Sequence, residues 1–155
     1  MKRKILFVCL GNICRSPAAE AVMKKQIEER GLSANFEIDS AGILSVHQGE
    51  KADSRMRQHA ARRGYEATSI SRQVKIDDFD RFDLIIGMDD SNIDDLNDCA
   101  LTAEHKSKIR QMTEYSKKYN YTHIPDPYYG GTAGFELVLD LLEDACTGLL
   151  ESFYK

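Results

Sequence analysis

The segment from residue 5 to residue 17 constrains this chain more than any other part of its sequence. Four apolar residues, 5–8, lead directly into Cys9, and the loop that follows ends at Ser16-Pro17. Ser is a favoured helix cap and Pro a favoured first helical residue, so this pair predicts the start of a helix. The loop therefore joins a strand to a helix N-terminus, where backbone N–H groups can converge on an anion. We expect Cys9 at the floor of this cradle and Arg15 at its rim.

The length and composition predict an ordinary globular protein. The 155 residues correspond to about one domain, residues 1–155, and they suffice to bury a core. Hydrophobic residues make up 42% and charged residues 30% of the chain, which is typical of soluble proteins. The net charge of −4 argues against general binding to nucleic acid or a membrane surface, because such proteins usually carry a basic face. An anionic substrate must therefore be attracted locally.

The N-terminal segment and the cysteines indicate a cytoplasmic protein. The basic residues 2–4 and the apolar run after them resemble a signal peptide, but the run ends at Gly11-Asn12 and no small-residue cleavage site follows. No other run approaches the roughly 20 apolar residues that span a bilayer. The cysteines are too few and too irregularly spaced for a secreted disulfide framework, and a reducing compartment suits them better. They are Cys9, Cys14, Cys99 and Cys146.

Apolar strand patterns alternate with helical patterns along the chain. This alternation predicts an α/β fold, a single three-layer domain with a short, mostly parallel four-stranded sheet flanked by helices, doubly wound and flavodoxin-like. Ligands bind such sheets at the carboxyl ends of the strands, and Cys9 follows the first strand. We expect strands at residues 5–8, 36–42, 82–88 and 111–115, and helices at residues 18–30, 53–63, 89–96, 102–112 and 135–153.

The loop carries the residues that thiol-based phosphate chemistry needs. Cys9 and Arg15 have the spacing Cys-x5-Arg, and a helix N-terminus with a nearby arginine favours the thiolate, which attacks phosphorus. The planar guanidinium of Arg15 can grip two phosphoryl oxygens, and Ser16 can donate a hydrogen bond to the thiolate. Asn12 tolerates a left-handed backbone and can bond across the loop. The phosphate would contact Leu10, Gly11, Asn12, Ile13, Cys14 and Ser16.

Other interpretations of these residues are less well supported. Cys9 could be a small buried hydrophobe and Arg15 a surface charge, but the strand, glycine and helix-start signals around them favour a cradle. A P-loop is excluded because no Gly-x4-Gly-Lys-Ser/Thr occurs. A zinc site lacks a second Cys or His pair, so we expect no metal and no cofactor. Asp89-Asp90 resembles a magnesium-binding site, but Asp is a usual helix cap and we expect capping there.

Asp126 is the best candidate for a proton donor to a leaving group. It lies between Pro125 and Pro127, which stiffen the loop and fix where the carboxyl group points. The adjacent Tyr128 and Tyr129 offer flat walls for an aromatic substrate. As general acid, Asp126 would protonate a departing phenolate, and as base it would activate water on a phospho-cysteine. Taken alone, however, this segment is more typical of a turn aspartate between prolines.

In combination, these segments resemble the low-molecular-weight protein tyrosine phosphatase family, and the resemblance covers nearly the whole chain. The matching blocks keep the family's order and separations, and together they are highly specific. They are residues 9–17, residues 39–42 with Gly49, Asp53 and Arg55, Met88-Asp89 with Ser91-Asn92, and residues 126–130.

The resemblance implies a role for each matching residue. Cys9 would be the nucleophile, Arg15 the phosphate clamp, and Asp126 the general acid and then the base. The implied activity is metal-independent hydrolysis of phosphotyrosine, in a protein or a small aryl phosphate, through a phospho-cysteine. A hydrogen-bond network that holds the loop and tunes the thiolate would consist of Asn12, Ser16 and Ser40.

The resemblance also bears on substrate class and redox control. Ile13 matches the tyrosine phosphatases of the family, whereas relatives that resemble phosphoarginine phosphatases carry Thr there. Cys14 matches a second loop cysteine that can form a reversible disulfide with the nucleophile under oxidation. Tyr128 and Tyr129 correspond to residues that line the cleft and that are phosphorylation sites in some members.

Two positions depart from the family pattern. Val46 stands where a large aromatic residue usually forms one wall of the cleft, which weakens the case for a strong aryl preference. Ser69 stands where many members have a histidine in the loop network, and its hydroxyl can still hydrogen-bond there. Outside the matching blocks we expect surface or loop positions for His47, His59, His105 and His123 and for the acidic residues Asp77, Asp78 and Asp80.

Two rival functions remain open at this point. An arsenate reductase shares this loop and fold but needs a resolving pair of cysteines in a later segment, where Cys99 stands alone. A non-catalytic phosphotyrosine-binding module predicts binding without turnover, and it would have little use for Asp126.

Overall fold

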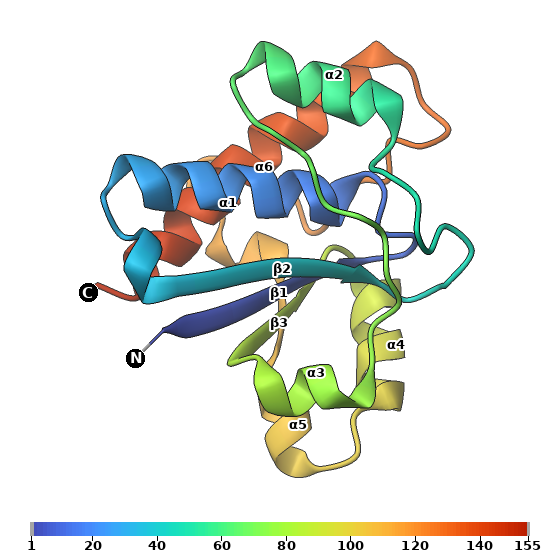
Figure 1. Ribbon diagram of the computed structural model, residues 1–155, viewed down its shortest axis with the longest axis vertical. Coiled ribbons are helices and arrows are strands. Elements are labelled where there is room, and N and C mark those ends of the chain that lie inside the picture. The colour runs from blue at the N-terminus through green and yellow to red at the C-terminus, as the bar shows by residue number, and fades with distance from the viewer. Residues whose placement is uncertain (1, 155) are drawn as a thin grey trace.

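A four-stranded parallel sheet forms the centre of the protein, whose computed structural model describes residues 2–154 (Figure 1). The strand order is β2-β1-β3-β4, and every neighbouring pair is parallel. This arrangement confirms the predicted α/β fold, and it places the end of β1 at the middle of the sheet. The strands are β1 Arg3–Cys9, β2 Phe36–Gly42, β3 Leu84–Gly87 and β4 Ile109–Gln111.

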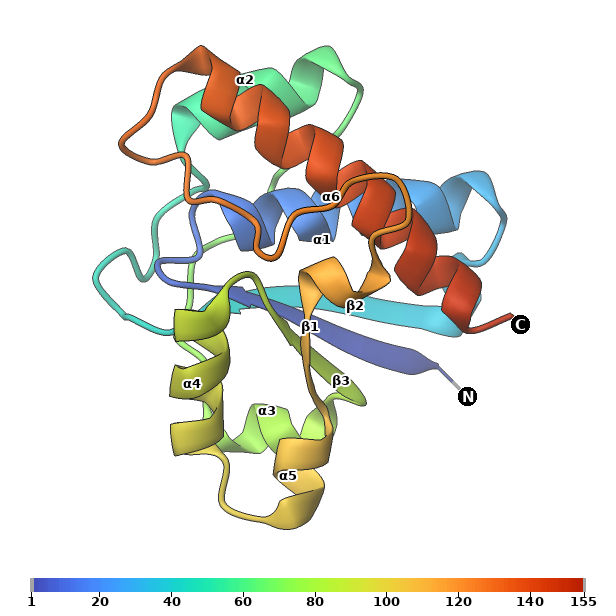
Figure 2. The same ribbon diagram turned by 180° about the vertical axis from the view of Figure 1, so that it is seen from behind.

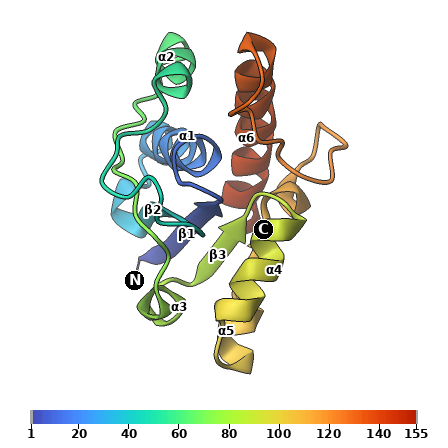
Figure 3. The ribbon, with the colours of Figure 1, turned by 90° about the vertical axis from the view of Figure 1, so that its right-hand side faces the viewer.

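Helices cover both faces of the sheet and complete three layers (Figures 1 and 3). One face carries α1 Arg15–Glu29 and α6 Thr132–Ser152, and α2 Ser54–Arg62 packs against these two helices. The other face carries α3 Ile76–Arg81, α4 Asp90–Cys99 and α5 Ala103–Ser107. Two short 3-10 helices, η1 Ser33–Asn35 and η2 Met112–Tyr115, lie in the connections.

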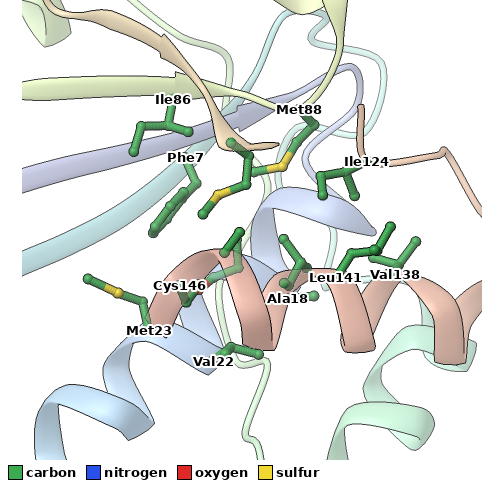
Figure 4. Close-up of a cluster of buried hydrophobic side chains, with 14 of the residues drawn as sticks. Phe7, Ala18, Val22, Met23, Ile86, Met88, Ile124, Val138, Leu141 and Cys146 are labelled. Carbon is green, nitrogen blue, oxygen red and sulfur yellow. The ribbon is translucent and has the colours of Figure 1, made fainter. Parts of the chain in front are cut away.

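Strand β1 is apolar throughout because both of its faces are covered. Ile5 and Phe7 point into the cluster between the sheet, α1 and α6, while Leu6 and Val8 point into the cluster beneath the other face. All four side chains are fully buried. Figure 4 shows the first cluster, in which Phe7 faces side chains of α1 and α6, among them Val22 and Cys146.

The region from residue 76 to residue 115 differs from the sequence prediction. The segment expected as a helix at residues 102–112 contains only α5, followed by β4 and then η2, so the predicted strand at 111–115 is misplaced. Here Thr102 caps a short helix by accepting from the His105 backbone at 3.0 Å. The segment then extends so that Ile109 can pair with Ile85 and bury its side chain. Packing against the sheet therefore outweighs helix propensity.

Helix α3 was not foreseen, because its acidic residues suggested solvated surface. The structure corrects that expectation for Asp78, which is only 5% exposed. Asp78 accepts from the Lys75 backbone at 2.7 Å and pairs with the Arg72 guanidinium at 3.0 Å. An acidic run thus supplies both a helix-start bond and a buried ion pair.

No helix within residues 2–154 combines the length and the apolar character that crossing a membrane requires.

Helix α6 makes its closest approach to η2 at Gly148. A Cβ atom built at Gly148 would lie 1.9 Å from the carbonyl oxygen of Tyr115, a contact that the backbone cannot tolerate. By contrast, a Cβ at Gly134 in the same helix would meet Pro127 at 3.6 Å, an ordinary contact.

We therefore predict that Gly148→Ala lowers the free energy of unfolding by about 1–3 kcal/mol, because overpacking outweighs the gain in helix propensity. Gly134→Ala is the matched control and should leave stability unchanged or slightly raised. Urea denaturation of both variants checks this. Equal stability of the two variants would contradict the close approach of Gly148 to the Tyr115 carbonyl.

Candidate active site

The loop between β1 and α1 turns sharply at Asn12, whose φ of 56° lies in the left-handed region, as predicted. The helix begins two residues earlier than expected, since Cys14 is the N-cap in place of Ser16 and its carbonyl accepts from Ala18 at 3.2 Å. Ser16 therefore lies inside the first turn of α1, and the prediction that it caps the helix is wrong. Its side chain is free to serve the loop instead.

Ser16 directs a hydroxyl group at the sulfur of Cys9. The Cys9 Sγ and Ser16 Oγ atoms are 3.1 Å apart. Asn12 Nδ2 donates to Ser16 Oγ at 2.8 Å and to Ser40 Oγ at 3.0 Å. Because Ser16 Oγ already accepts from Asn12, its own proton is available to the sulfur, the Ala41 carbonyl being more distant at 3.4 Å. The structure thus brings together the residues that were expected to form the loop network.

The network extends into the interior through a glutamate that sequence reasoning missed. Ser40 Oγ donates to Glu20 Oε1 at 2.6 Å, and Lys24 Nζ donates to Glu20 Oε2 at 2.6 Å. Glu20 is only 6% exposed. It lies in α1, and its spacing to Lys24, i to i+4, is the one signal that could have indicated a pair. The carboxylate thereby fixes the orientation of the Ser40 hydroxyl.

Ser71 and Arg72 contact the loop from the opposite side. Ser71 Oγ donates to the Gly11 carbonyl at 3.0 Å, and the Arg72 backbone donates to Asn12 Oδ1 at 3.0 Å. Ser69 Oγ, in contrast, is buried without a hydrogen-bond partner among the described residues. The expectation that Ser69 joins the network is therefore wrong, and Ser71 makes the contact instead.

Arg15 is held by fixed acceptors beneath the cleft. Its side chain is 3% exposed, and Nη1 donates to Asp89 Oδ2 at 2.6 Å and to the Ile124 carbonyl at 3.1 Å. Burial works to lower the pKa of Arg15, but the negative charges of Cys9, Asp89 and Asp126 outweigh it and raise that pKa. The guanidinium is therefore charged at every pH at which the protein is folded.

Asp89 has two functions, of which only one was predicted. Its Oδ1 accepts from the Asn92 backbone at 2.8 Å, which confirms it as the cap of α4. Its other oxygen is the partner of Arg15. The second contact joins residues far apart in sequence, so no local pattern could have indicated it.

The segment from residue 124 to residue 131, here called the acid loop, crosses the cleft from the end of β3 towards α2. The Ile124 backbone donates to the Met88 carbonyl at 2.8 Å, and Arg55 Nη2 donates to the Tyr128 carbonyl at 3.0 Å. Between these anchors, Asp126 Oδ1 accepts from the Tyr128 backbone at 3.1 Å. Asp126 Oδ2 lies 3.6 Å from Arg15 Nη2, so the carboxylate faces the loop from across the cleft.

A cleft of about 160 Å³ opens between the phosphate-binding loop, the loop after β2 and the acid loop. Val46 and Tyr129 stand at its rim, 69% and 93% exposed. Asn12, Ser16 and Ser40 lie behind the cleft rather than in it. The lining residues are Cys9, Leu10, Gly11, Ile13, Cys14, Arg15, Leu44, Val46, His47, Asp126, Tyr128 and Tyr129.

The histidines are less exposed than the sequence suggested. His47 lines the cleft, and its ring lies against Gly11 and 6.2 Å from the ring of Tyr128. His59 is buried, stacks on Phe135 and bonds to Glu136. His105 is also buried, whereas His123 is exposed and His47 lies in a loop, as expected. Leu44 and His47 are thus cleft residues that sequence reasoning missed, because their loop has no regular pattern.

Cys14 is a buried free thiol beside the nucleophile candidate. Burial, followed by the charges of Asp53, Cys9 and Asp126, raises the pKa of the Cys14 thiol. It therefore carries its proton at neutral pH. Within the described residues, no group of three or more His, Cys, Asp or Glu side chains is arranged to hold a metal ion.

Comparison with known proteins identifies the family. Residues 4–155 match the family described as low molecular weight phosphotyrosine protein phosphatase. The chain belongs to this family. It is 41% identical to the low molecular weight protein-tyrosine-phosphatase of Streptomyces coelicolor, over 97% of this chain and 93% of that protein. It is 38% identical to the human low molecular weight phosphotyrosine protein phosphatase, over 96% and 94% of the two chains.

Solved structures of the family have the same fold. The crystal structure of a protein tyrosine phosphatase from Entamoeba histolytica, with Hepes in its active site, matches with a TM-score of 0.96 and 50% identity. The match covers 99% of this chain and 97% of that chain. The resemblance predicted from the sequence motifs is therefore confirmed.

Asp53 links the phosphate-binding loop to α2. Its backbone donates to the Ile13 carbonyl at 2.8 Å, and its Oδ1 accepts from the Arg55 backbone at 2.8 Å as the cap of α2. Burial works to raise the pKa of Asp53, but hydrogen bonds and charge from Arg55 outweigh it, so the pKa is lowered.

We predict that Asp53→Ala lowers the free energy of unfolding by about 1 kcal/mol at pH 7, as loss of a helix cap does. Because the folded-state pKa is lowered, the wild-type advantage is complete above the unfolded pKa near 3.9 and is lost as pH falls through the folded value. Urea denaturation between pH 7 and pH 3 measures it, with Ser54→Ala as the control that should change little. If Asp53→Ala lowers the free energy of unfolding as much at pH 3 as at pH 7, this account is contradicted.

Proposed function

We propose that this protein hydrolyses phosphotyrosine, in a protein or a small aryl phosphate, without a metal and through a phospho-cysteine intermediate. One observation carries the proposal. Cys9 lies in a cleft under Ser16, while the Arg15 guanidinium and the Asp126 carboxylate face each other across the same cleft at 3.6 Å. Family membership supports the same activity.

Arg15 and the loop amides would hold the phosphoryl group. Apart from Asn12, the residues from 10 to 15 line the cleft, where their amides would donate to the phosphoryl oxygens. Arg15 can offer Nη2 because Asp89 and the Ile124 carbonyl occupy Nη1. Such donors stabilise the charge that develops on the equatorial oxygens, and each contributes on the order of 3–4 kcal/mol to lowering the barrier. A guanidinium held in advance needs no reorganisation during the reaction.

The first step transfers the phosphoryl group to sulfur. The Cys9 thiolate attacks phosphorus, an S–P bond forms, and the bond from phosphorus to the aryl oxygen breaks. Asp126, carrying a proton, donates it to that oxygen so that a neutral phenol leaves. Ser16 donates a hydrogen bond to Cys9 Sγ, which stabilises the thiolate before attack and again as a leaving group.

The second step returns the enzyme to its starting state. Asp126, now a carboxylate, takes a proton from a water molecule as that water attacks phosphorus. The S–P bond breaks, inorganic phosphate is formed, and the Cys9 thiolate is regenerated. Asp126 recovers its proton in this step, so the cycle consumes only water.

The cleft walls favour a flat substrate. Tyr128 and His47 supply aromatic surfaces, and Ile13 adds an apolar side chain to the lining. Val46 is too exposed to replace the large aromatic side chain that is usual at its position. We therefore assign the aryl preference to Tyr128 and His47 rather than to Val46.

The two rival functions lack support from the structure. An arsenate reductase would need a resolving cysteine pair, and Cys99 lies at the end of α4 with no cysteine beside it among the described residues. A phosphotyrosine reader would not need Asp126, whose carboxylate is held over the cleft.

We predict that the protein hydrolyses nitrophenyl phosphate equally with and without EDTA. Cys9→Ser should abolish turnover, and Asp126→Ala should lower kcat for phenyl phosphate by roughly 10²–10⁴-fold, as loss of a general acid does. Asp126→Ala should lower kcat less for nitrophenyl phosphate, since nitrophenolate leaves without a proton. Steady-state kinetics with both substrates check this.

Cys99→Ser is the matched control for the thiol substitution, and it should keep full activity. Turnover by Cys9→Ser at the wild-type rate would rule out the thiol mechanism. Tight binding of phosphotyrosine with no turnover in the wild type would favour the reader.

We also propose that Cys14 protects the nucleophile in a reducing, cytoplasmic setting. Both thiols line one cleft and are free. Peroxide would oxidise the Cys9 thiolate to a sulfenic acid with release of hydroxide. The Cys14 thiol would then attack that sulfur, forming the disulfide and releasing water, and a thiol reductant would reverse it.

Peroxide should accordingly inactivate the wild type reversibly, with activity restored by dithiothreitol. Cys14→Ser should recover poorly, because its sulfenic acid is open to further oxidation. Activity assays before and after reduction measure the recovery, with Cys146→Ser as the control. Equal recovery of Cys14→Ser and the wild type would contradict the protective role.

A further inference from the structure

A second groove lies beside the catalytic cleft, on the α2 side of the acid loop. One wall is the exposed side of α2, and the other is the first turn of α6 together with Gly130 and Gly131. Figures 1 and 2 show α2 next to the start of α6, with the acid loop leading into that helix. This groove takes no part in the reaction described above.

The α2 wall carries a basic stripe, which consists of Arg55, Gln58 and Arg62. These residues are spaced i, i+3 and i+7, so they share one face of the helix, and all three are exposed. Helix α2 contains no acidic residue, and the first turn of α6 opposite has none either. A carboxylate entering the groove therefore meets no acidic side chain from the facing ends of these helices.

Of the two arginines that line the groove, Arg62 is available to pair with a ligand. Arg55 pairs with Asp53 at 3.0 Å, and Glu136 is held by His59 and by Arg63. Arg62 makes no ion pair or side-chain hydrogen bond among the described residues. The groove thus presents a local positive charge on a chain whose net charge is −4.

Arg55 connects this groove to the cleft. Its guanidinium lies 5.4 Å from the ring of Tyr128, which lines the cleft, and 4.9 Å from the ring of Phe135, which lines the groove. The seven helical steps from Arg55 to Arg62 span about 10 Å, a distance that about three residues of extended peptide cover. A peptide that leaves the cleft past Tyr128 can therefore reach the basic stripe within a few residues of its phosphotyrosine.

We propose that the basic stripe binds acidic residues that flank the phosphotyrosine of a protein substrate. This proposal rests on the proposed function and adds a preference among its substrates. The carboxylates of Asp or Glu pair with Arg62 while the phosphotyrosine occupies the cleft. Each exposed ion pair is weak, so the stripe acts mainly by steering association, and its effect falls as salt rises.

The test compares two phosphotyrosine peptides that differ only in their flanks. One carries Glu at the second to fifth positions on both sides of the phosphotyrosine, and the other carries Gln at those positions. For the wild type at low ionic strength, kcat/KM should be roughly fivefold higher for the Glu peptide, and the advantage should shrink at high salt. Arg62→Glu should abolish or reverse the advantage, whereas Arg62→Lys should retain it.

Arg30→Glu is the matched control. Arg30 follows the last turn of α1, at the opposite end of that helix from the phosphate-binding loop, and it is also exposed. This variant makes the same charge change and should keep the preference of the wild type. Equal kcat/KM for the two peptides in the wild type, or an unchanged preference in Arg62→Glu, would overturn the proposal.

Hydrolysis of nitrophenyl phosphate separates this failure from failure of the proposed function. If the wild type hydrolyses nitrophenyl phosphate but shows no preference between the two peptides, only the proposed role of the basic stripe is overturned. If the wild type hydrolyses neither the peptides nor nitrophenyl phosphate, the proposed phosphatase function is overturned, and so is the proposed role of the stripe.

Discussion

The side chain of Asn12 holds the phosphate-binding loop in shape. It is 1% exposed, and its amide donates to Ser16 and Ser40 while its carbonyl oxygen accepts from the backbone of Arg72. These bonds hold a left-handed residue in place, and they join α1, β2 and the segment before α3 at one point. A buried amide with both of its ends satisfied specifies one geometry, because any other leaves polar groups unpaired. The position of Cys9 under Ser16 depends on this arrangement.

Arg15 is the second constraint, and it links the phosphate-binding loop to the rest of the sheet. A buried guanidinium is costly unless it is paired, and Asp89 at the end of β3 supplies the pairing charge. The Ile124 carbonyl adds a bond from the acid loop, so the same side chain positions the segment that carries Asp126. The elements that follow three parallel strands thus meet around one cation. Substrate phosphate would add a further anion to a cation that is already oriented.

The sequence allowed most of the fold and the central part of the site to be predicted, because those signals are local. Cys9, Asn12 and Arg15 lie within one short loop, and the apolar strand before them indicates where it falls. The pairing of Arg15 with Asp89 and the cleft position of His47 were missed, since both depend on contacts between distant segments or on an irregular loop. Packing likewise decided the region after residue 102, where β4 extends to pair with β3.

The central claim is that Cys9 becomes phosphorylated during turnover. The most direct measurement is mass spectrometry of Asp126→Ala quenched rapidly after mixing with nitrophenyl phosphate, followed by mapping of the modified peptide. Loss of the base slows hydrolysis of the intermediate, so the account predicts one phosphoryl group on Cys9 and none in a variant that also carries Cys9→Ser. A phosphoryl group on another residue would contradict the account. So would rapid release of nitrophenol without any phosphorylated cysteine.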